Sequence, residues 1–214
     1  MCEIRLLFPV HMRTFFQDDT WQSGLEEIRV RVGQPIEFCY GSDNCYLIGK
    51  EKEQMFCSEK DYRRWEKDLY HASEADLREM LNYISNYSLY AYKEEIKQGY
   101  ITIEGGHRVG VAGQTVLVDG KIAGISPITF LNIRIAHEKC GCARKILPLI
   151  RQKNSIYNTL ILSMPGAGKT TLLRDSIRAL SNGEAYGIRL KVCVVDERSE
   201  IAASFHGVPQ NDMG

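Results

Sequence analysis

SMPGAGKTT, residues 163–171, is the stretch of sequence that decides the fold. A glycine-rich turn of this kind directs backbone N–H groups at phosphate oxygens, and Gly166 and Gly168 permit the dihedral angles and the close approach that this requires. Lys169 is expected to bridge the β- and γ-phosphates of a nucleotide, and the Thr170 hydroxyl is expected to ligate Mg²⁺. The sequence therefore predicts a phosphate-binding loop.

The segments on either side of this loop match what such a loop needs. We expect a strand over 158–163 and a helix over 169–180, whose positive N-terminal end faces the phosphates. The apolar positions of the helix share one face and comprise Leu172, Leu173, Ile177 and Leu180. Three charged positions fall outside that face, namely Arg174, Asp175 and Arg178. One position departs from the motif, because Ser163 stands where its first glycine is usual. Strand and helix together favour a nucleotide-binding loop over a chance glycine-lysine turn.

A second polar cluster follows the apolar segment 190–195, which is predicted to be a strand. Asp196 and Glu197 come directly after it, and Asp196 lies 27 residues beyond Lys169. This spacing places them on the next strand after the loop helix, too early for a typical Walker B strand. Glu197 is interpreted as the residue that activates the attacking water, and Asp196 as a second candidate for contact with metal or water. The alternative is a solvated strand end at which an aspartate pairs with an arginine.

Upstream of the loop, the pattern changes near residue 100 from mixed strands and helices to mainly strands. Residues 28–32 alternate apolar and charged side chains, as a half-buried strand does, and Ser73 precedes a helical pattern as a capping residue. Asp119-Gly120 between two apolar runs predicts a tight hairpin. We therefore expect three segments: an α+β domain over 1–99, a β-rich segment with a linking helix over 100–152, and a partial P-loop NTPase core over 153–214.

Composition narrows the class of protein. The chain has 214 residues, of which 44% are hydrophobic and 25% charged, and this excludes a disordered protein. Lysine plus arginine (27) balances aspartate plus glutamate (27), so no nucleic-acid partner is expected. No apolar run is long enough to cross a bilayer, and seven cysteines fit reduced thiols in a cytosolic protein better than a disulfide framework. A zinc site is not expected at His137, Cys140 and Cys142, because a fourth ligand at suitable spacing is missing.

Four stretches resemble a sporulation family in the secretion-ATPase branch of the P-loop NTPases. They are GHRVG at 106–110, IRIA at 133–136, the loop at 163–171 and VDERSEIA at 195–202. The resemblance implies an α/β fold with a RecA-like P-loop NTPase core, preceded by an α+β N-terminal domain. It also implies a core that is C-terminally incomplete, because the family continues beyond the position of Gly214 with its Walker B strand and sensor region. Secretion ATPases carry an acidic box after the loop helix, and residues 196–200 resemble it.

Carried over position by position, the resemblance suggests roles for individual residues. Glu197 or Glu200 becomes the catalytic carboxylate, acting with Lys169. Arginines of the preceding β-rich domain reach the nucleotide in this family, and Arg134 is the matching candidate, with Arg108 second; for both, a solvated strand face is the equal alternative. The residues expected to bind the nucleotide are Pro165, Gly166, Ala167, Gly168, Lys169, Thr170, Thr171 and Arg134. Those expected to bind the metal are Thr170 and Asp196.

The resemblance also implies a function. ATP and Mg²⁺ are the expected cofactors of an ATPase that energises or gates a membrane-embedded sporulation channel between mother cell and forespore. The expected assembly is a hexameric homo-oligomer, cytoplasmic and peripheral at the cytoplasmic face of the membrane. Two alternatives stay open: a nucleic-acid-directed P-loop ATPase, and a non-hydrolysing nucleotide-binding scaffold. Since no Walker B strand is recognisable, we expect this chain alone to hydrolyse ATP poorly or not at all.

Overall fold

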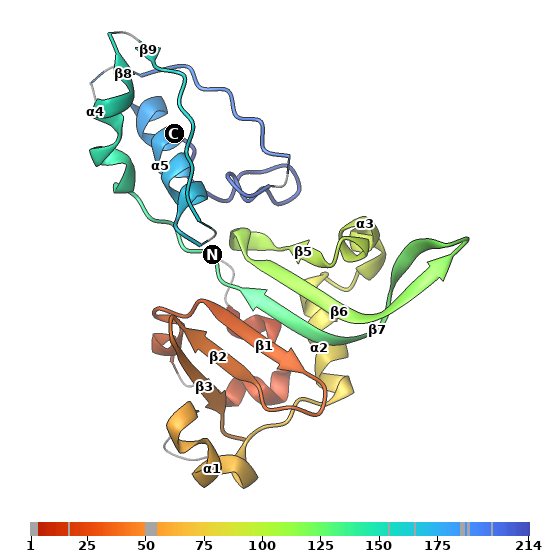
Figure 1. The fold of residues 1–214 in the computed structure, drawn as a ribbon. Coiled ribbons are helices and arrows are strands. Elements are labelled where there is room, and N and C mark those ends of the chain that lie inside the picture. Colours follow the sequence, from red (N-terminus) through yellow and green to blue (C-terminus); the bar gives the residue numbers. More distant parts are fainter. Residues whose placement is uncertain are drawn as a thin grey trace. The chain divides into compact units, whose positions relative to one another are not determined.

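The computed structural model describes residues 4–16, 18–49, 55–153, 155–164, 166–184, 187, 189–197 and 199–214. They form two compact units, Met1–Ala136 and His137–Gly214 (Figure 1). This division differs from the three expected segments. Strands from both 1–99 and 100–152 join one sheet, so these segments do not form separate bodies, and the linking helix belongs to the second unit.

The first unit is built on a seven-stranded antiparallel sheet in the order β4-β3-β2-β1-β7-β6-β5. Its strands are β1 Glu27–Arg31, β2 Glu37–Tyr40, β3 Asp43–Leu47, β4 Phe56–Ser58, β5 Tyr100–Thr102, β6 Arg108–Val118 and β7 Lys121–Arg134. Ile28 lies opposite Ile133, and Val30 opposite Leu131, in the pairing of β1 with β7. All four side chains are fully buried, so the alternation in residues 28–32 does mark a strand with one face in the core.

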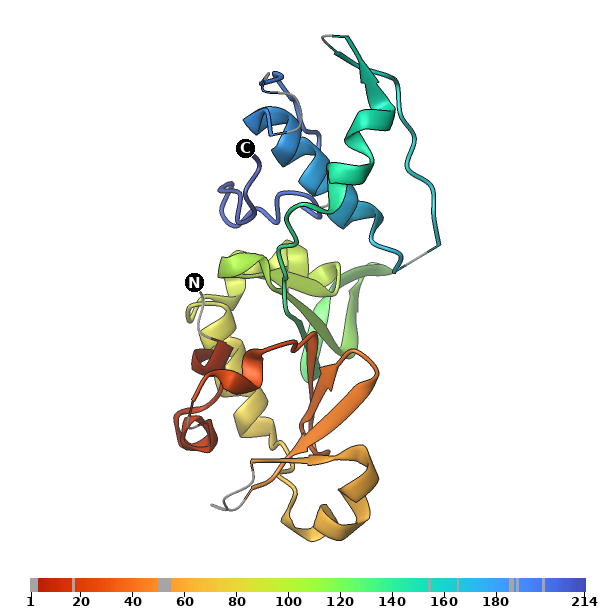
Figure 2. The same cartoon turned by 90° about the vertical axis from the view of Figure 1, so that its left-hand side faces the viewer.

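Helices cover the buried face of this sheet, as Figure 2 shows for α2 (Glu74–Ile84) and the short N-terminal helices. Phe8, Phe16, Trp21 and Phe38 form an aromatic cluster there, with ring centroids 4.6–6.2 Å apart. The other helical elements of the unit are η1 Ile4–Leu7, η2 Val10–Phe15, η3 Thr20–Gln22, η4 Glu59–Asp61, α1 Tyr62–Trp65, η5 Glu66–Asp68, η6 Leu89–Tyr92, α3 Lys93–Lys97 and η7 Glu104–Gly106.

Helix α2 begins with the capping box that the sequence predicts. The Ser73 hydroxyl accepts a hydrogen bond from the Asp76 backbone N–H at 3.1 Å, and the Asp76 carboxylate accepts one from the Ser73 N–H at 2.8 Å. Two otherwise unpaired backbone donors are thereby satisfied.

Replacement of Ser73 by alanine is expected to lower the free energy of unfolding by about 1 kcal/mol, because the first-turn N–H loses its acceptor. Urea denaturation followed by tryptophan fluorescence measures this, since both tryptophans lie in the first unit. Ser88→Ala is the matched control, because the Ser88 side chain caps no helix. Equal midpoints for Ser73→Ala and the parent chain would contradict the role of the capping box.

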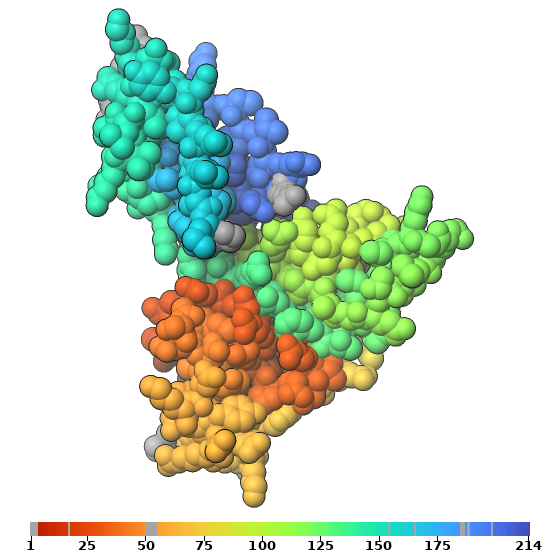
Figure 3. Space-filling view, viewed as in Figure 1, coloured from red at the N-terminus to blue at the C-terminus, as the bar shows by residue number. Residues whose placement is uncertain are grey.

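Strands β6 and β7 form a long hairpin whose end carries exposed apolar side chains. Asp119 and Gly120 have φ angles of 51° and 72°, so the tight turn predicted from the sequence is confirmed. Val116, Leu117, Val118 and Ile122 are exposed next to this turn. Figure 3 shows the green end of the hairpin extending from the surface of its unit.

The second unit is organised around α5 (Lys169–Asn182), the helix expected after the glycine-rich loop. Ala143 and Leu147 pack with Ala179 and Leu180 to form its core. The linking helix expected over 142–152 is shorter and divided, and the following residues form a small hairpin. These elements are η8 Cys142–Lys145, α4 Leu147–Ile150, β8 Arg151–Gln152 and β9 Ser155–Ile156.

The two strands expected over 158–163 and 190–195 are not formed in the described part of the chain. Both segments run without a strand partner beside a groove of about 710 Å³ that is lined mainly by apolar side chains. Leu160, Leu162 and Val195 are 86%, 87% and 88% exposed. A strand is stable only when a neighbouring strand takes up its backbone N–H and C=O groups, and among the described residues no other strand pairs with either segment. A P-loop NTPase sheet therefore stays a proposal for this chain.

Candidate functional site

The glycine-rich loop 163–171 leads directly into α5. Gly166 and Gly168 have φ angles of 77° and 83°, in the left-handed region that side chains disfavour, and Gly168 is the N-cap of α5. A Cβ atom built on either glycine meets no atom within 4 Å. Glycine is thus required by backbone conformation, and the loop surface is open to a ligand. Pro165, expected to contribute to this site, lies outside the described residues.

The Lys169 ammonium group is folded back over the loop. Its Nζ donates hydrogen bonds to the backbone carbonyl oxygens of Ser163 at 3.1 Å and Met164 at 2.9 Å. An ammonium group carries three N–H donors, so one is left for an added acceptor. The positive charge is thereby held on the loop itself.

The backbone at the start of α5 supplies further donors. Among the described residues, the N–H groups of Gly168, Lys169, Thr170 and Thr171 donate to no acceptor, and the first helical bond runs from Leu172 N–H to the Gly168 carbonyl at 2.9 Å. Free N–H groups, the helix dipole and an ammonium group together suit a polyphosphate anion. The expected ligands Ala167, Thr170 and Thr171 therefore belong to one continuous turn with Gly166, Gly168 and Lys169. A turn with these donors can bind a phosphate-containing anion.

Asp196, expected at the metal, has a different set of contacts. Its Oδ1 accepts a hydrogen bond from the Glu200 N–H, and its Oδ2 accepts from the N–H groups of Ile201 and Ala202, each at 2.9 Å. The carboxylate thus folds the following loop around itself. Among the described residues, no hydrogen bond or ion pair joins Asp196 or Glu197 to the loop 163–171. Glu197 and Glu200 are exposed on the loop that Asp196 shapes.

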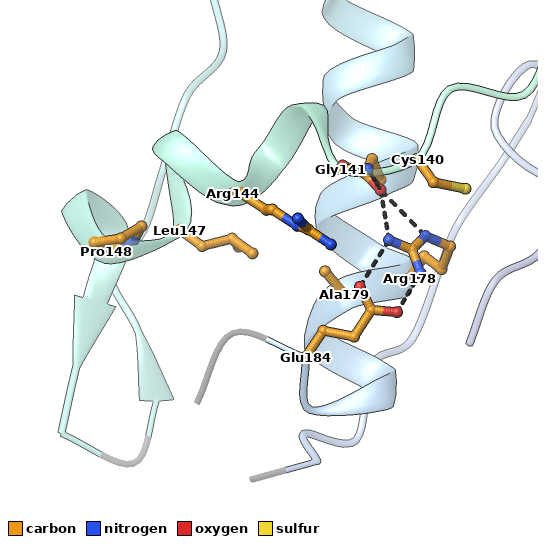
Figure 4. A pocket seen from close by; sticks show the side chains of 9 residues that line it. Cys140, Gly141, Arg144, Leu147, Pro148, Arg178, Ala179 and Glu184 are labelled. Atoms are coloured by element: carbon orange, nitrogen blue, oxygen red, sulfur yellow. Dashed lines mark hydrogen bonds and ion pairs between the residues drawn. The ribbon is translucent and has the colours of Figure 1, made fainter. Parts of the chain in front are cut away.

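Asp175 and Arg178 correct the sequence-based view of α5, which left both outside its packed face. They are only 3% and 7% exposed. The Asp175 carboxylate accepts hydrogen bonds from the backbone N–H groups of Gly141 at 2.9 Å and Ala143 at 2.7 Å. Arg178 donates to Asp175 at 2.8 Å and also pairs with Glu184 (Figure 4). The two charges are buried because each has specific partners.

This network shifts the pKa values of its members. Burial alone raises the pKa of Asp175, but the hydrogen bonds from Ala143, Gly141 and Arg178 outweigh it and lower the pKa to about 2. Hydrogen bonds to Glu184 and Asp175 raise the pKa of Arg178. The network borders a cavity of about 790 Å³. It fixes η8 to α5, the helix that starts at the glycine-rich loop. The i,i+3 spacing of Asp175 and Arg178 is a local signal for their ion pair, but the sequence pattern gave no signal for the contacts with Gly141 and Ala143.

The two candidate arginines lie in the first unit. The Arg134 side chain is 66% exposed, and its Nε lies 3.8 Å from Glu27 Oε2 across β1 and β7. Arg108 stacks its guanidinium on the Tyr100 ring at 3.7 Å from the centroid. Each therefore has a neighbour on its own sheet, and contact with a nucleotide stays a prediction.

The described parts of the chain hold neither a metal-ligand cluster nor a membrane-spanning helix. No three side chains of His, Cys, Asp or Glu gather there as metal ligands. No helix among those parts has the length and apolar character needed to span a membrane.

Comparisons with known proteins identify the family. The family model described as "Sporulation stage III, protein AA" matches residues 2–214. The curated "Stage III sporulation protein AA" of Bacillus subtilis (strain 168) is 38% identical over 216 residues, which cover all of this chain and 63% of that protein. No solved structure matches the chain significantly. The chain thus spans less than two thirds of the relative's length, and it belongs to the sporulation stage III protein AA family.

Proposed function

We propose that this chain binds ATP and Mg²⁺ at residues 163–171 and serves as an ATPase subunit in sporulation. The observation that carries the proposal is the turn at the start of α5, where the Lys169 ammonium lies over the loop and four backbone N–H groups have no acceptor among the described residues. A convergent set of this kind stabilises a triphosphate more strongly than a single lysine does.

In the proposed reaction, water attacks the γ-phosphorus in line with the leaving β–γ bridging oxygen. Lys169 and the α5 N–H groups stabilise the negative charge on the phosphoryl oxygens, and Glu197 or Glu200 orients the water. Mg²⁺, when bound through the Thr170 hydroxyl, neutralises phosphate charge. Asp196 contributes by holding the loop that carries the two glutamates, since its carboxylate oxygens already accept three backbone hydrogen bonds.

Membership of the family supports a role in sporulation, and the rest of the cellular role is proposed. A sporulation protein with a nucleotide site is suited to energise or gate a membrane-embedded channel between mother cell and forespore, and we propose that it acts from the cytoplasmic face of the membrane. A homo-oligomeric ring, hexameric as in secretion ATPases, would place an arginine such as Arg134 near a bound nucleotide. These statements go beyond the sporulation assignment, and the resemblance to secretion ATPases is their support.

A non-hydrolysing scaffold is the second candidate, and one observation favours it. The segments 158–163 and 190–195 have no strand partner among the described residues, so the support for a catalytic carboxylate at the end of 190–195 is incomplete. We expect the chain to bind nucleotide and to hydrolyse it slowly or not at all.

Isothermal titration calorimetry with Mg-ATP, together with a phosphate-release assay, tests both candidates. Saturable binding of one nucleotide per chain with little phosphate release supports the site and the scaffold-like behaviour of this chain. Binding with rapid turnover supports the ATPase without any further strand. Absence of heat with both Mg-ATP and Mg-GTP, for protein shown to be folded by circular dichroism, would contradict nucleotide binding.

A further inference from the structure

In the described part of the chain, the hydrogen bonds between the acidic loop 196–202 and α5 come from the side chain of Arg174. Arg174 donates from Nε to the Ile201 carbonyl oxygen at 2.7 Å and from Nη2 to the Glu200 carbonyl oxygen at 2.8 Å. A guanidinium presents its donors in a rigid fork, so two adjacent carbonyl groups fix both its position and its orientation. The same arginine was expected only as a charged residue outside the apolar face of the helix.

Hydrogen bonds from the segment near the C-terminus also hold the acidic loop. Asn211, which is buried, donates from Nδ2 to the Ile201 carbonyl at 2.9 Å, and the Gln210 N–H donates to the Ala202 carbonyl at 2.9 Å. The Asp196 carboxylate, at the start of the loop, accepts hydrogen bonds from the backbone N–H groups of residues 200–202. Residues 200–202 are therefore held by several hydrogen bonds, and Arg174 makes the two that come from α5 among the described residues.

Arg174 stands at a particular place on α5. It lies four residues after Thr170, and positions four apart share one face of a helix at a rise of about 6 Å. Thr170 belongs to the first turn of α5, where Lys169 and the N–H groups that have no acceptor among the described residues lie. A rigid helix can transmit a displacement of its first turn to the next turn, and that next turn carries Arg174.

We propose that Arg174 is a positioning residue that couples nucleotide occupancy at loop 163–171 to the arrangement of the acidic loop 196–202. The proposal rests on the proposed function, because it requires a nucleotide at the glycine-rich loop. Its consequence is that the exposed carboxylates Glu197 and Glu200 are set by the state of the nucleotide site, although no described hydrogen bond joins Glu197 to that site.

Amide hydrogen exchange with and without Mg-ATP tests this coupling in the whole chain. In the parent protein, Mg-ATP is expected to slow exchange at the N–H groups of residues 200–202 by about fivefold or more. Arg174→Ala is expected to bind a fluorescent ATP analogue within about threefold of the parent affinity, while the nucleotide effect on residues 200–202 falls below about twofold. Arg174→Lys retains one donor and is expected to restore part of the effect. Arg189→Ala, at an exposed arginine of the same unit, is the control and retains all of it.

The possible outcomes are distinct. Exchange of the α5 amides at residues 177–180 shows whether a variant is folded. If Arg174→Ala is not folded, Arg174→Lys decides instead: a nucleotide effect smaller than that of the parent chain supports the coupling, and a full effect overturns it. A full effect in a folded Arg174→Ala variant would overturn the coupling, as would nucleotide binding to the parent chain without any change at residues 200–202. If the parent chain binds no nucleotide, the proposed function itself fails and the coupling with it. Faster exchange of residues 200–202 in Arg174→Ala without nucleotide would then show a purely structural contact.

Discussion

Replacement of Lys169 by alanine is expected to weaken the binding of Mg-ATP by about 30- to 100-fold, the loss that one or two charged hydrogen bonds to phosphate produce. The Lys169 ammonium already lies over the loop, 2.9 Å from the Met164 carbonyl oxygen, so the parent chain does not need to reorder this side chain to meet a phosphate. Alanine keeps the helix intact, since it is the best helix former. Fluorescence anisotropy of an ATP analogue measures the affinity.

The matched control is Lys145→Ala, which removes an exposed lysine from η8 of the same unit. We expect its affinity for the analogue to stay within about twofold of the parent value, since a screened surface charge contributes little. Equal affinities for Lys169→Ala and the parent chain would show that the nucleotide binds elsewhere.

Replacement of Asp175 by asparagine is expected to destabilise the second unit by about 2–3 kcal/mol. The substitution keeps the size of the side chain but removes the charge that Arg178 and the N–H groups of Gly141 and Ala143 share, and a buried arginine then keeps only Glu184 as its anionic partner. Urea denaturation, with hydrogen exchange of the α5 amides as the readout, measures this free energy. Asp119→Asn, in the exposed β6–β7 turn, is the control and should change stability by less than about 0.5 kcal/mol.

The difference in stability between the parent chain and Asp175→Asn is also expected to depend on pH. The pKa of Asp175 is lowered from 3.8 to about 2 in the folded chain, so its contribution is present in full well above pH 4. The contribution of Asp175 to stability is lost as the pH falls from about 4 to about 2, because the folded state takes up a proton less readily there than the unfolded state does. The shift corresponds to about 2 kcal/mol. The difference in stability between the parent chain and Asp175→Asn should therefore shrink between about pH 5 and pH 2. A difference that is constant with pH would mean that the asparagine acts through packing alone.

Local signals predicted much of the fold. The alternation in residues 28–32, the capping box at Ser73 and the turn at Asp119-Gly120 each depend on side chains a few positions apart, and the structure contains all three. The strands over 158–163 and 190–195 were not predicted correctly. An apolar run gives a strand only where another strand pairs with it, and that neighbour is a property of the whole sheet.

The candidate site likewise has one part that local sequence predicts and another that depends on distant segments. Gly166, Gly168 and Lys169 form the turn that their spacing predicts, because its geometry is set within nine residues. The contacts that Asp175 and Arg174 make with other segments were missed, since their backbone partners are 26 to 34 positions away in the sequence. Both are polar side chains on a helix that looks amphipathic, and only the folded chain shows that backbone groups of other segments meet them.

The central claim is that the turn at the start of α5 holds the phosphates of a nucleotide, and two-dimensional ¹H–¹⁵N spectra of the chain titrated with Mg-ATP test it most directly. We expect the largest saturable shifts on the amide signals of Gly166, Gly168, Lys169, Thr170 and Thr171. Inorganic phosphate at the same concentration should shift these signals less, since it meets fewer donors. Spectra that stay unchanged, or whose largest shifts lie in the first unit or around the Asp175–Arg178 network, would contradict the account.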